Sequence, residues 1–152
     1  MARLYFVEQF YQSYERFIEE NTKCKKLEDK EECEKILQNL DAFIKQELNR
    51  IKENPEYGER QRINTPWFKV SLPPEWELRK LKRDIPEKIV NRVFHRRAKS
   101  RGARKLRIMY LYHPQNKMVV PIFIYTHYQY ENMPPGYDIQ EGIDEAKEMG
   151  EE

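Results

Sequence analysis

Residues 105–128, KLRIMYLYHPQNKMVVPIFIYTHY, are the stretch that decides the fold class of this chain. Residues 105–112 and 119–128 are rich in aliphatic, β-branched and aromatic side chains, which is typical of β-strands. The residues between them, from His113 to Lys117, have the composition of a turn. The stretch therefore predicts a β-hairpin. Pro121 has no N–H to donate to a neighbouring strand, so we expect it at a sheet edge or at a bulge.

Two helices are predicted upstream of this hairpin, after a short strand at residues 2–7. Apolar side chains recur at helical spacing over residues 10–18. A longer helical pattern covers residues 33–51 and should end just before Pro55, because the residue that precedes a proline disfavours the helical backbone. Residues 55–83 contain several prolines and are expected to form an irregular insertion.

These elements together predict an α+β protein, in which a small twisted antiparallel sheet packs on an N-terminal helical hairpin. A chain of 152 residues is long enough to bury a core of its own. We expect a single domain over residues 1–137. Residues 138–152 are expected to be an acidic tail that forms a short helix.

The composition excludes several classes of protein. With 39% hydrophobic and 12% aromatic residues, the chain is too apolar to be disordered. No apolar run approaches the ~18 residues of a membrane span, and Glu8 comes too early for a signal peptide. We therefore expect a cytoplasmic protein that does not contact a membrane. Cys24 and Cys33 either remain free thiols or close a disulfide loop between two helices.

The charge of this chain is strongly segregated along the sequence. Residues 76–107 carry 13 basic and three acidic side chains, whereas residues 129–152 carry one basic and eight acidic side chains. The basic block predicts a polyanionic partner, although a solvated surface is the alternative. The acidic tail either keeps the protein soluble or folds over the basic block and competes with nucleic acid. A third helix, expected to start at Asp84, would carry part of the block. The candidate nucleic-acid-binding residues are Lys88, Arg92, Arg96, Arg97, Lys99, Arg101, Arg104 and Lys105.

The hairpin supplies the candidate site, since no catalytic motif or set of metal ligands is apparent from spacing. Arg107 and residues 126–128 both lie far from the connecting turn, so the hairpin should bring them together. Arginine binds phosphate through two parallel hydrogen bonds, and histidine exchanges a proton near neutral pH. This combination suits RNA, in which a ribose 2′-hydroxyl could attack the adjacent phosphate without a metal or other cofactor.

Residues 104–128 resemble the C-terminal strands of the RelE/ParE toxin superfamily, and most closely its YoeB-like ribonuclease branch. The sequence RIMY at 107–110 resembles that branch's arginine-aliphatic-aliphatic-tyrosine strand, and YTHY at 125–128 resembles its terminal aromatic-x-His-Tyr strand. The order of strand, helical hairpin, basic segment and hairpin is also similar. The resemblance implies a RelE/ParE-like fold and a toxin that cuts mRNA in the ribosomal decoding site or poisons gyrase. It also implies a cognate antitoxin that covers the active face.

Carried over to this chain, the resemblance implies that Arg107 contacts the phosphate, His127 transfers a proton, and Tyr128 positions or stacks on the nucleotide. The branch has an acidic residue before its arginine strand, whereas residues 96–107 contain none and resemble the lysine- and arginine-based RelE site instead. In addition, 24 residues follow Tyr128, where the family chain usually ends.

The function that we predict from the sequence is a toxin of a toxin-antitoxin system. Its activity would be metal-independent endonucleolytic cleavage of mRNA, with the ribosome as the expected place of action. The alternatives are a non-catalytic RNA- or DNA-binding protein, and a ParE-like inhibitor of a protein target. The sequence leaves the oligomeric state open.

Overall fold

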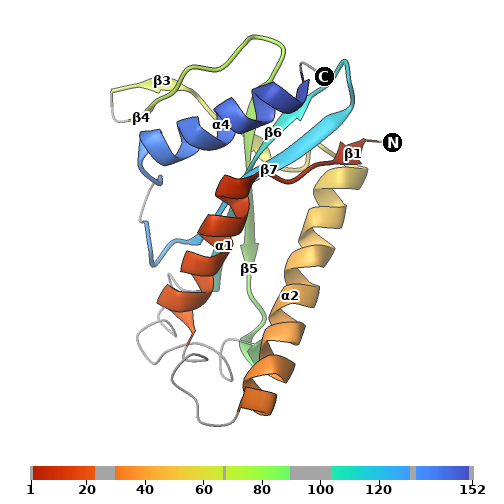
Figure 1. Cartoon of the computed structure of the whole chain (residues 1–152), viewed down its shortest axis with the longest axis vertical. Helices are drawn as coiled ribbons and strands as arrows, with labels where there is room; N and C mark the ends of the chain where they lie inside the picture. Colours follow the sequence, from red (N-terminus) through yellow and green to blue (C-terminus); the bar gives the residue numbers. More distant parts are fainter. Residues whose placement is uncertain (1, 23–29, 67, 90–103, 131–132, 151–152) are drawn as a thin grey trace.

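The computed structural model describes residues 2–22, 30–66, 68–89, 104–130 and 133–150 (Figure 1). Long helices in the described residues are α1 (Glu8–Asn21), α2 (Lys30–Glu53) and α4 (Gly136–Gly150). The main sheet contains β1 (Arg3–Leu4), β2 (Glu59–Arg60), β5 (Glu77–Asp84), β6 (Lys105–His113) and β7 (Met118–Thr126). A separate two-stranded sheet contains β3 (Asn64–Thr65) and β4 (Phe68–Lys69). The fold is therefore α+β, as predicted.

The five strands of the main sheet lie in the order β1-β7-β6-β5-β2. β6 and β7 are antiparallel neighbours, which confirms the predicted hairpin. β1 pairs with β7 in parallel, with Arg3 opposite Met118. The expectation of an entirely antiparallel sheet is therefore wrong at this edge. Two helices separate β1 from the other strands, so no hairpin turn forces it to run antiparallel to its neighbour.

Pro121 lies at a bulge in the pairing of β6 with β7. Met109 is opposite Phe123 and Tyr110 is opposite Pro121, so Ile122 is the extra residue on β7. A bulge tolerates proline because its missing N–H is not needed by the ladder there. α4 approaches β7 closely at this point, since a Cβ on Gly142 would lie 2.7 Å from the Ile122 Cβ.

α1 and α2 form where the sequence predicts them and run side by side in Figure 1. The Tyr14 hydroxyl of α1 donates a hydrogen bond to Asp41 Oδ1 of α2, at 3.2 Å. α2 ends at Glu53, just before the Asn54-Pro55 pair, as expected. The sequence leaves open whether Cys33 of α2 is a free thiol or forms a disulfide, and in the structure it is disulfide-bonded. Six buried apolar residues of the two helices belong to the core: Phe10, Phe17, Leu40, Ile44, Leu48 and Ile51.

The segment predicted to be an irregular insertion, residues 55–83, contains most of strand β5. All eight residues of β5 pair with β6. Six of the eight are charged, and Leu78 and Leu81 are three residues apart, so the segment lacks the alternation of a typical strand. Pairing along the full length of β6 overrides this weak local preference.

The sequence predicts that a third helix starts at Asp84, and this is wrong, because Asp84 is the last residue of β5. Residues 87–89 are helical, and they follow directly after Pro86. Proline is well suited to the start of a helix, since its missing N–H has no partner in the first turn. The remainder of the expected helix lies outside the described residues.

The acidic C-terminal segment forms α4, which packs against α1 and β7 (Figure 1). Ile139, Ile143 and Ala146 are fully buried in the core. The backbone N–H of Gln9 donates to Glu145 Oε2 at 3.2 Å, which joins the start of α1 to α4. The described part of this segment is therefore built into the fold, with its apolar stripe inward.

Tyr110 of β6 holds the loop that follows α2 against the sheet. Its hydroxyl donates to the Pro55 carbonyl at 2.6 Å and accepts from the Gly58 N–H at 2.8 Å. Gly58 has to be glycine here, because a Cβ would lie 2.6 Å from the same hydroxyl oxygen. Burial raises the pKa of Tyr110 to about 12, so the hydroxyl keeps its proton at neutral pH.

We predict that the substitution Tyr110→Phe lowers the free energy of unfolding by about 1–3 kcal/mol. The ring still fits, but the Pro55 carbonyl and the Gly58 N–H lose their partner. Urea unfolding of the variant and the wild type measures the difference. An unchanged midpoint would show that water replaces the hydroxyl at no cost.

Candidate functional site

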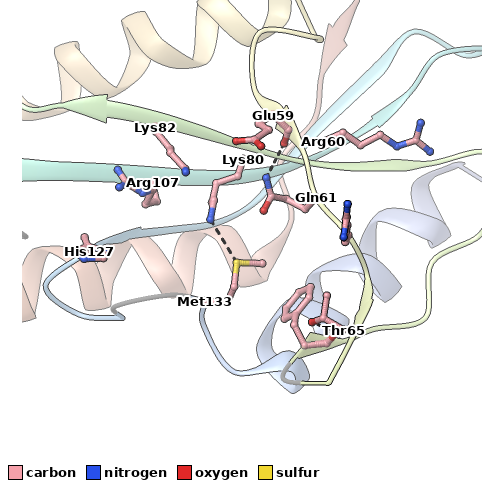
Figure 2. A pocket seen from close by; sticks show the side chains of 11 residues that line it. Glu59, Arg60, Gln61, Thr65, Lys80, Lys82, Arg107, His127 and Met133 are labelled. Carbon is pink, nitrogen blue, oxygen red and sulfur yellow. Dashed lines mark hydrogen bonds between the residues drawn. The ribbon is translucent and has the colours of Figure 1, made fainter.

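An open cleft of about 670 Å³ lies beside β5 and β6 (Figure 2). Its volume is within the range of small-ligand sites. Side chains of β5, β6 and the end of β7 meet there with side chains of the 59–68 segment. The lining residues are Glu59, Arg60, Gln61, Arg62, Thr65, Phe68, Lys80, Lys82, Arg107, His127 and Met133.

The pleat of the sheet explains why three of the cations point into this cleft. Lys80 and Lys82 are two residues apart on β5, so their side chains lie on the same face. Lys82 is directly opposite Arg107 of β6, and directly opposed residues share a face. Figure 2 shows the side chains of Lys82 and Arg107 next to each other, with Lys80 beside them. Tyr125 of β7 is opposite Arg107 on its other side and is fully buried.

The cleft has a strong excess of positive charge. Its described lining contains one carboxylate, that of Glu59, and five lysine or arginine side chains. Within the described part of the chain, none of these five cations takes part in an ion pair. A concave surface that gathers uncompensated cations attracts anions. The five cations are Arg60, Arg62, Lys80, Lys82 and Arg107.

Lys80 is the most constrained of these cations. Burial lowers its pKa first, the charges of Lys82 and Arg107 lower the pKa further, and Glu59 opposes the shift. Its Nζ donates to Met133 Sδ at 3.6 Å, and a thioether is a weak acceptor. Burial also lowers the pKa of Arg107, although a guanidinium keeps its charge in proteins. The cleft thus holds two half-buried cations, Lys80 and Arg107, beside the exposed Lys82, and the described residues do not supply a matching set of counterions.

We predict that Lys80→Met raises the melting temperature in low-salt buffer, because it removes one of three mutually repelling cations. The pKa of Lys80 is lowered in the folded protein, so the charge of Lys80 destabilises the fold, and this destabilisation is fully present at neutral pH. The destabilisation disappears as pH rises through the lowered pKa toward 10.5, and the gain in melting temperature from the substitution should shrink with it. Thermal melts from pH 7 upward test this, with the exposed Lys35→Met of α2 as a control. A lower melting temperature for Lys80→Met would contradict it.

Two of the three catalytic candidates from the sequence lie in the cleft. Arg107 and His127 both line it. The backbone N–H of His127 donates to the Lys105 carbonyl at 3.0 Å. Tyr128 is 43% exposed and does not line the cleft. The hairpin therefore brings the arginine and the histidine together and leaves the tyrosine at the surface.

The described nucleic-acid-binding candidates lie outside the cleft. Lys88 is exposed. Arg104 forms an ion pair with Glu87 at 2.8 Å, and Lys105 forms one with Asp84 at 2.7 Å. Both of these cations are thus partly neutralised by neighbours. The other candidates, Arg92, Arg96, Arg97, Lys99 and Arg101, lie outside the described residues.

Sequence reasoning did not select Lys80 and Lys82 as site residues. They belong to the basic block, but they also lie in the segment 55–83, for which the sequence predicts an irregular insertion and not a strand. Arg60 and Arg62 lie in the same segment and are not among the predicted site residues either. The Lys-Leu-Lys spacing at 80–82 was the available signal, since it places two ammonium groups on one face if the segment is a strand.

No protein-family model matches this chain, and no curated protein matches it either. Among the described residues, His, Cys, Asp and Glu side chains do not gather in groups of three or more that could hold a metal ion. A search of the same residues finds no helix with the length and apolar character needed to cross a membrane. The cleft itself is therefore the source of evidence about function.

Proposed function

We propose that this chain is a toxin of the RelE/ParE type that cleaves mRNA, with ribosome-bound mRNA as its substrate. The observation that carries the proposal is the convergence of Lys80, Lys82, Arg107 and His127 in one open cleft. A scissile phosphate needs positive charge around its non-bridging oxygens, and the first three residues supply it. A proton must also move, and an imidazole is suited to that task.

The proposed reaction is transesterification within the RNA strand. The ribose O2′ forms a bond to the adjacent phosphorus, and the bond from phosphorus to O5′ of the next nucleotide breaks. One proton leaves the 2′-hydroxyl and one proton reaches O5′. The products are a 2′,3′-cyclic phosphate and a 5′-hydroxyl. Arg107 and Lys82 stabilise the charge that develops on the phosphate, and His127 exchanges one of the two protons.

Two further features support the RelE/ParE type. The described elements begin with a strand and two helices, and the β6–β7 hairpin comes later in the chain, as in the resemblance seen in the sequence; strands β2 to β5 precede this hairpin and α4 follows it. Lys80 and Lys82 also give the cleft the lysine- and arginine-based character of a RelE site. They lie on β5, the strand that pairs with the arginine strand β6.

Cleavage of mRNA on programmed ribosomes, in buffer with EDTA, tests this function. The proposal predicts fragments that end in a 2′,3′-cyclic phosphate. A non-catalytic RNA- or DNA-binding protein would cut nothing, but the logarithm of its affinity would fall with the logarithm of salt by ~0.7 per neutralised phosphate on single strands. A ParE-like inhibitor of a protein target would show neither property, and either result would overturn the proposal.

A cognate antitoxin is the protein partner that this proposal requires. An acidic segment of such a partner would complement the uncompensated cations of the cleft and exclude mRNA from it. Co-expression with the product of an adjacent small reading frame should then relieve growth arrest caused by this chain. Relief should be lost when the acidic residues of that partner are replaced.

A further inference from the structure

A second hollow adjoins the cleft and shares two of its side chains. Lys82 and Arg107 line both spaces, so one continuous depression passes across them. The adjoining hollow has a volume of about 590 Å³, close to that of the cleft. Its other lining residues are Phe43 of α2 and Arg83, Asp84, Pro86 and Lys105.

Three of the charged groups of this hollow, Arg83, Asp84 and Lys105, take part in ion pairs. Arg83 Nε lies 3.2 Å from Glu47 Oε1, and Lys105 Nζ lies 2.7 Å from Asp84 Oδ1. Lys82 and Arg107 are therefore the cations of the hollow without an ion pair among the described residues. An anion should bind at the boundary between the two spaces, and the hollow beyond it should accept a less charged group.

The apolar wall of the hollow indicates what that group is. Phe43 is half-buried and presents an aromatic ring, and Pro86 is exposed beside it. Unpaired RNA bases stack on aromatic side chains, whereas bases within a duplex are stacked on their neighbours and are not available. Phe43 lies four residues before Glu47 on α2, and the contact of Glu47 with Arg83 fixes this part of α2 against β5.

We propose that the adjoining hollow is a subsite for the unpaired nucleotide next to the scissile phosphate, with its base against Phe43. This inference rests on the proposed function and specifies its substrate as an unpaired RNA strand of at least two nucleotides. The strand crosses the sheet over Lys82 and Arg107. Base contact with Phe43 then adds affinity that is separate from the phosphate contacts.

Binding of an uncleavable single-stranded RNA, with 2′-O-methyl ribose at every position, tests the subsite. Fluorescence anisotropy at fixed salt would compare the wild type with Phe43→Leu, Phe43→Tyr and Arg107→Ala. Stacking on one aromatic side chain corresponds to roughly 5- to 140-fold in affinity. We expect a loss of this order for Phe43→Leu and retention for Phe43→Tyr, which keeps an aromatic face. Thermal melts confirm that each variant folds.

An abasic site moved along the same RNA provides a second arm that needs no protein variant. At one position of the RNA, removal of the base should lower the affinity for the wild type by a similar factor. When the RNA lacks that base, Phe43→Leu should cause no further loss of affinity. If Phe43→Leu binds like the wild type while Arg107→Ala binds weakly, the subsite is refuted and the proposed function stands. If the wild type does not bind the RNA, the subsite is refuted, and cleavage of mRNA on programmed ribosomes decides separately whether the proposed function stands.

Discussion

Replacement of Arg107 by alanine is expected to slow mRNA cleavage about 10²–10³-fold, the usual effect of removing one preorganised donor to a developing negative charge. Arg107 lies at the junction of the cleft and the adjoining hollow, and it is half-buried opposite Lys82 and Tyr125. Among the described residues, its side chain makes one hydrogen bond, from Nη1 to the Leu106 carbonyl at 3.2 Å. Most of its guanidinium donors are therefore available to a phosphate.

Single-turnover cleavage on saturating programmed ribosomes measures this effect separately from binding. The matched control is Lys35→Ala, which removes an exposed cation of α2 that does not line the cleft and should leave the rate unchanged. Circular dichroism should show both variants to be folded. A folded Arg107→Ala variant that cleaves at the wild-type rate would remove Arg107 from the mechanism.

The second large effect is expected from Ile143→Ala in α4, which should lower the free energy of unfolding by about 2–5 kcal/mol. Ile143 is fully buried, between Ile139 and Ala146 on the stripe that packs into the core. For a domain of this size such a loss corresponds to a melting temperature lower by about 4–20 °C. The expected effect is one of stability, because no residue of α4 lines the cleft.

Glu141→Ala is the control for Ile143→Ala, since Glu141 is exposed on the same helix. Its melting temperature should stay within a degree or two of the wild type, as is usual for surface substitutions. If Ile143→Ala melts with the wild type, α4 is not part of the cooperative fold and the C-terminal segment is a separable tail.

The sequence was sufficient to predict the elements whose side chains follow a clear period. The helical stripes of α1 and α2 and the apolar runs of β6 and β7 are all present. The proline signals were also informative, because Pro55 marks the end of α2 and Pro121 marks the bulge. In each case a local preference and the tertiary packing favour the same structure.

β5 could not be predicted in this way, because its structure depends on a partner distant in sequence. Its charged side chains are tolerated in the sheet since several of them line the cleft or pair with acids, as Arg79 does with Glu77 at 2.7 Å. The parallel pairing of β1 with β7 could not be predicted either, because a strand of two residues is too short for its sequence to indicate the direction of pairing. Non-local pairing decides both features.

The candidate site was predicted only in part for the same reason. Arg107 and His127 lie on the hairpin that the sequence specifies, so their proximity could be inferred from the turn. Lys80 and Lys82 join them through the pairing of β5 with β6. Tyr128 follows the last strand, where the alternation of the sheet no longer fixes the direction of a side chain.

Metal-independent cleavage by the cleft is the central claim, and one assay tests it most directly. The wild type and the double variant Arg107→Ala/His127→Ala are incubated with mRNA on programmed ribosomes in EDTA, after both are shown to be folded. We predict that the wild type cleaves and leaves 2′,3′-cyclic phosphate ends, while the double variant does not. Equal cleavage by both proteins, or cleavage by neither, would contradict the account.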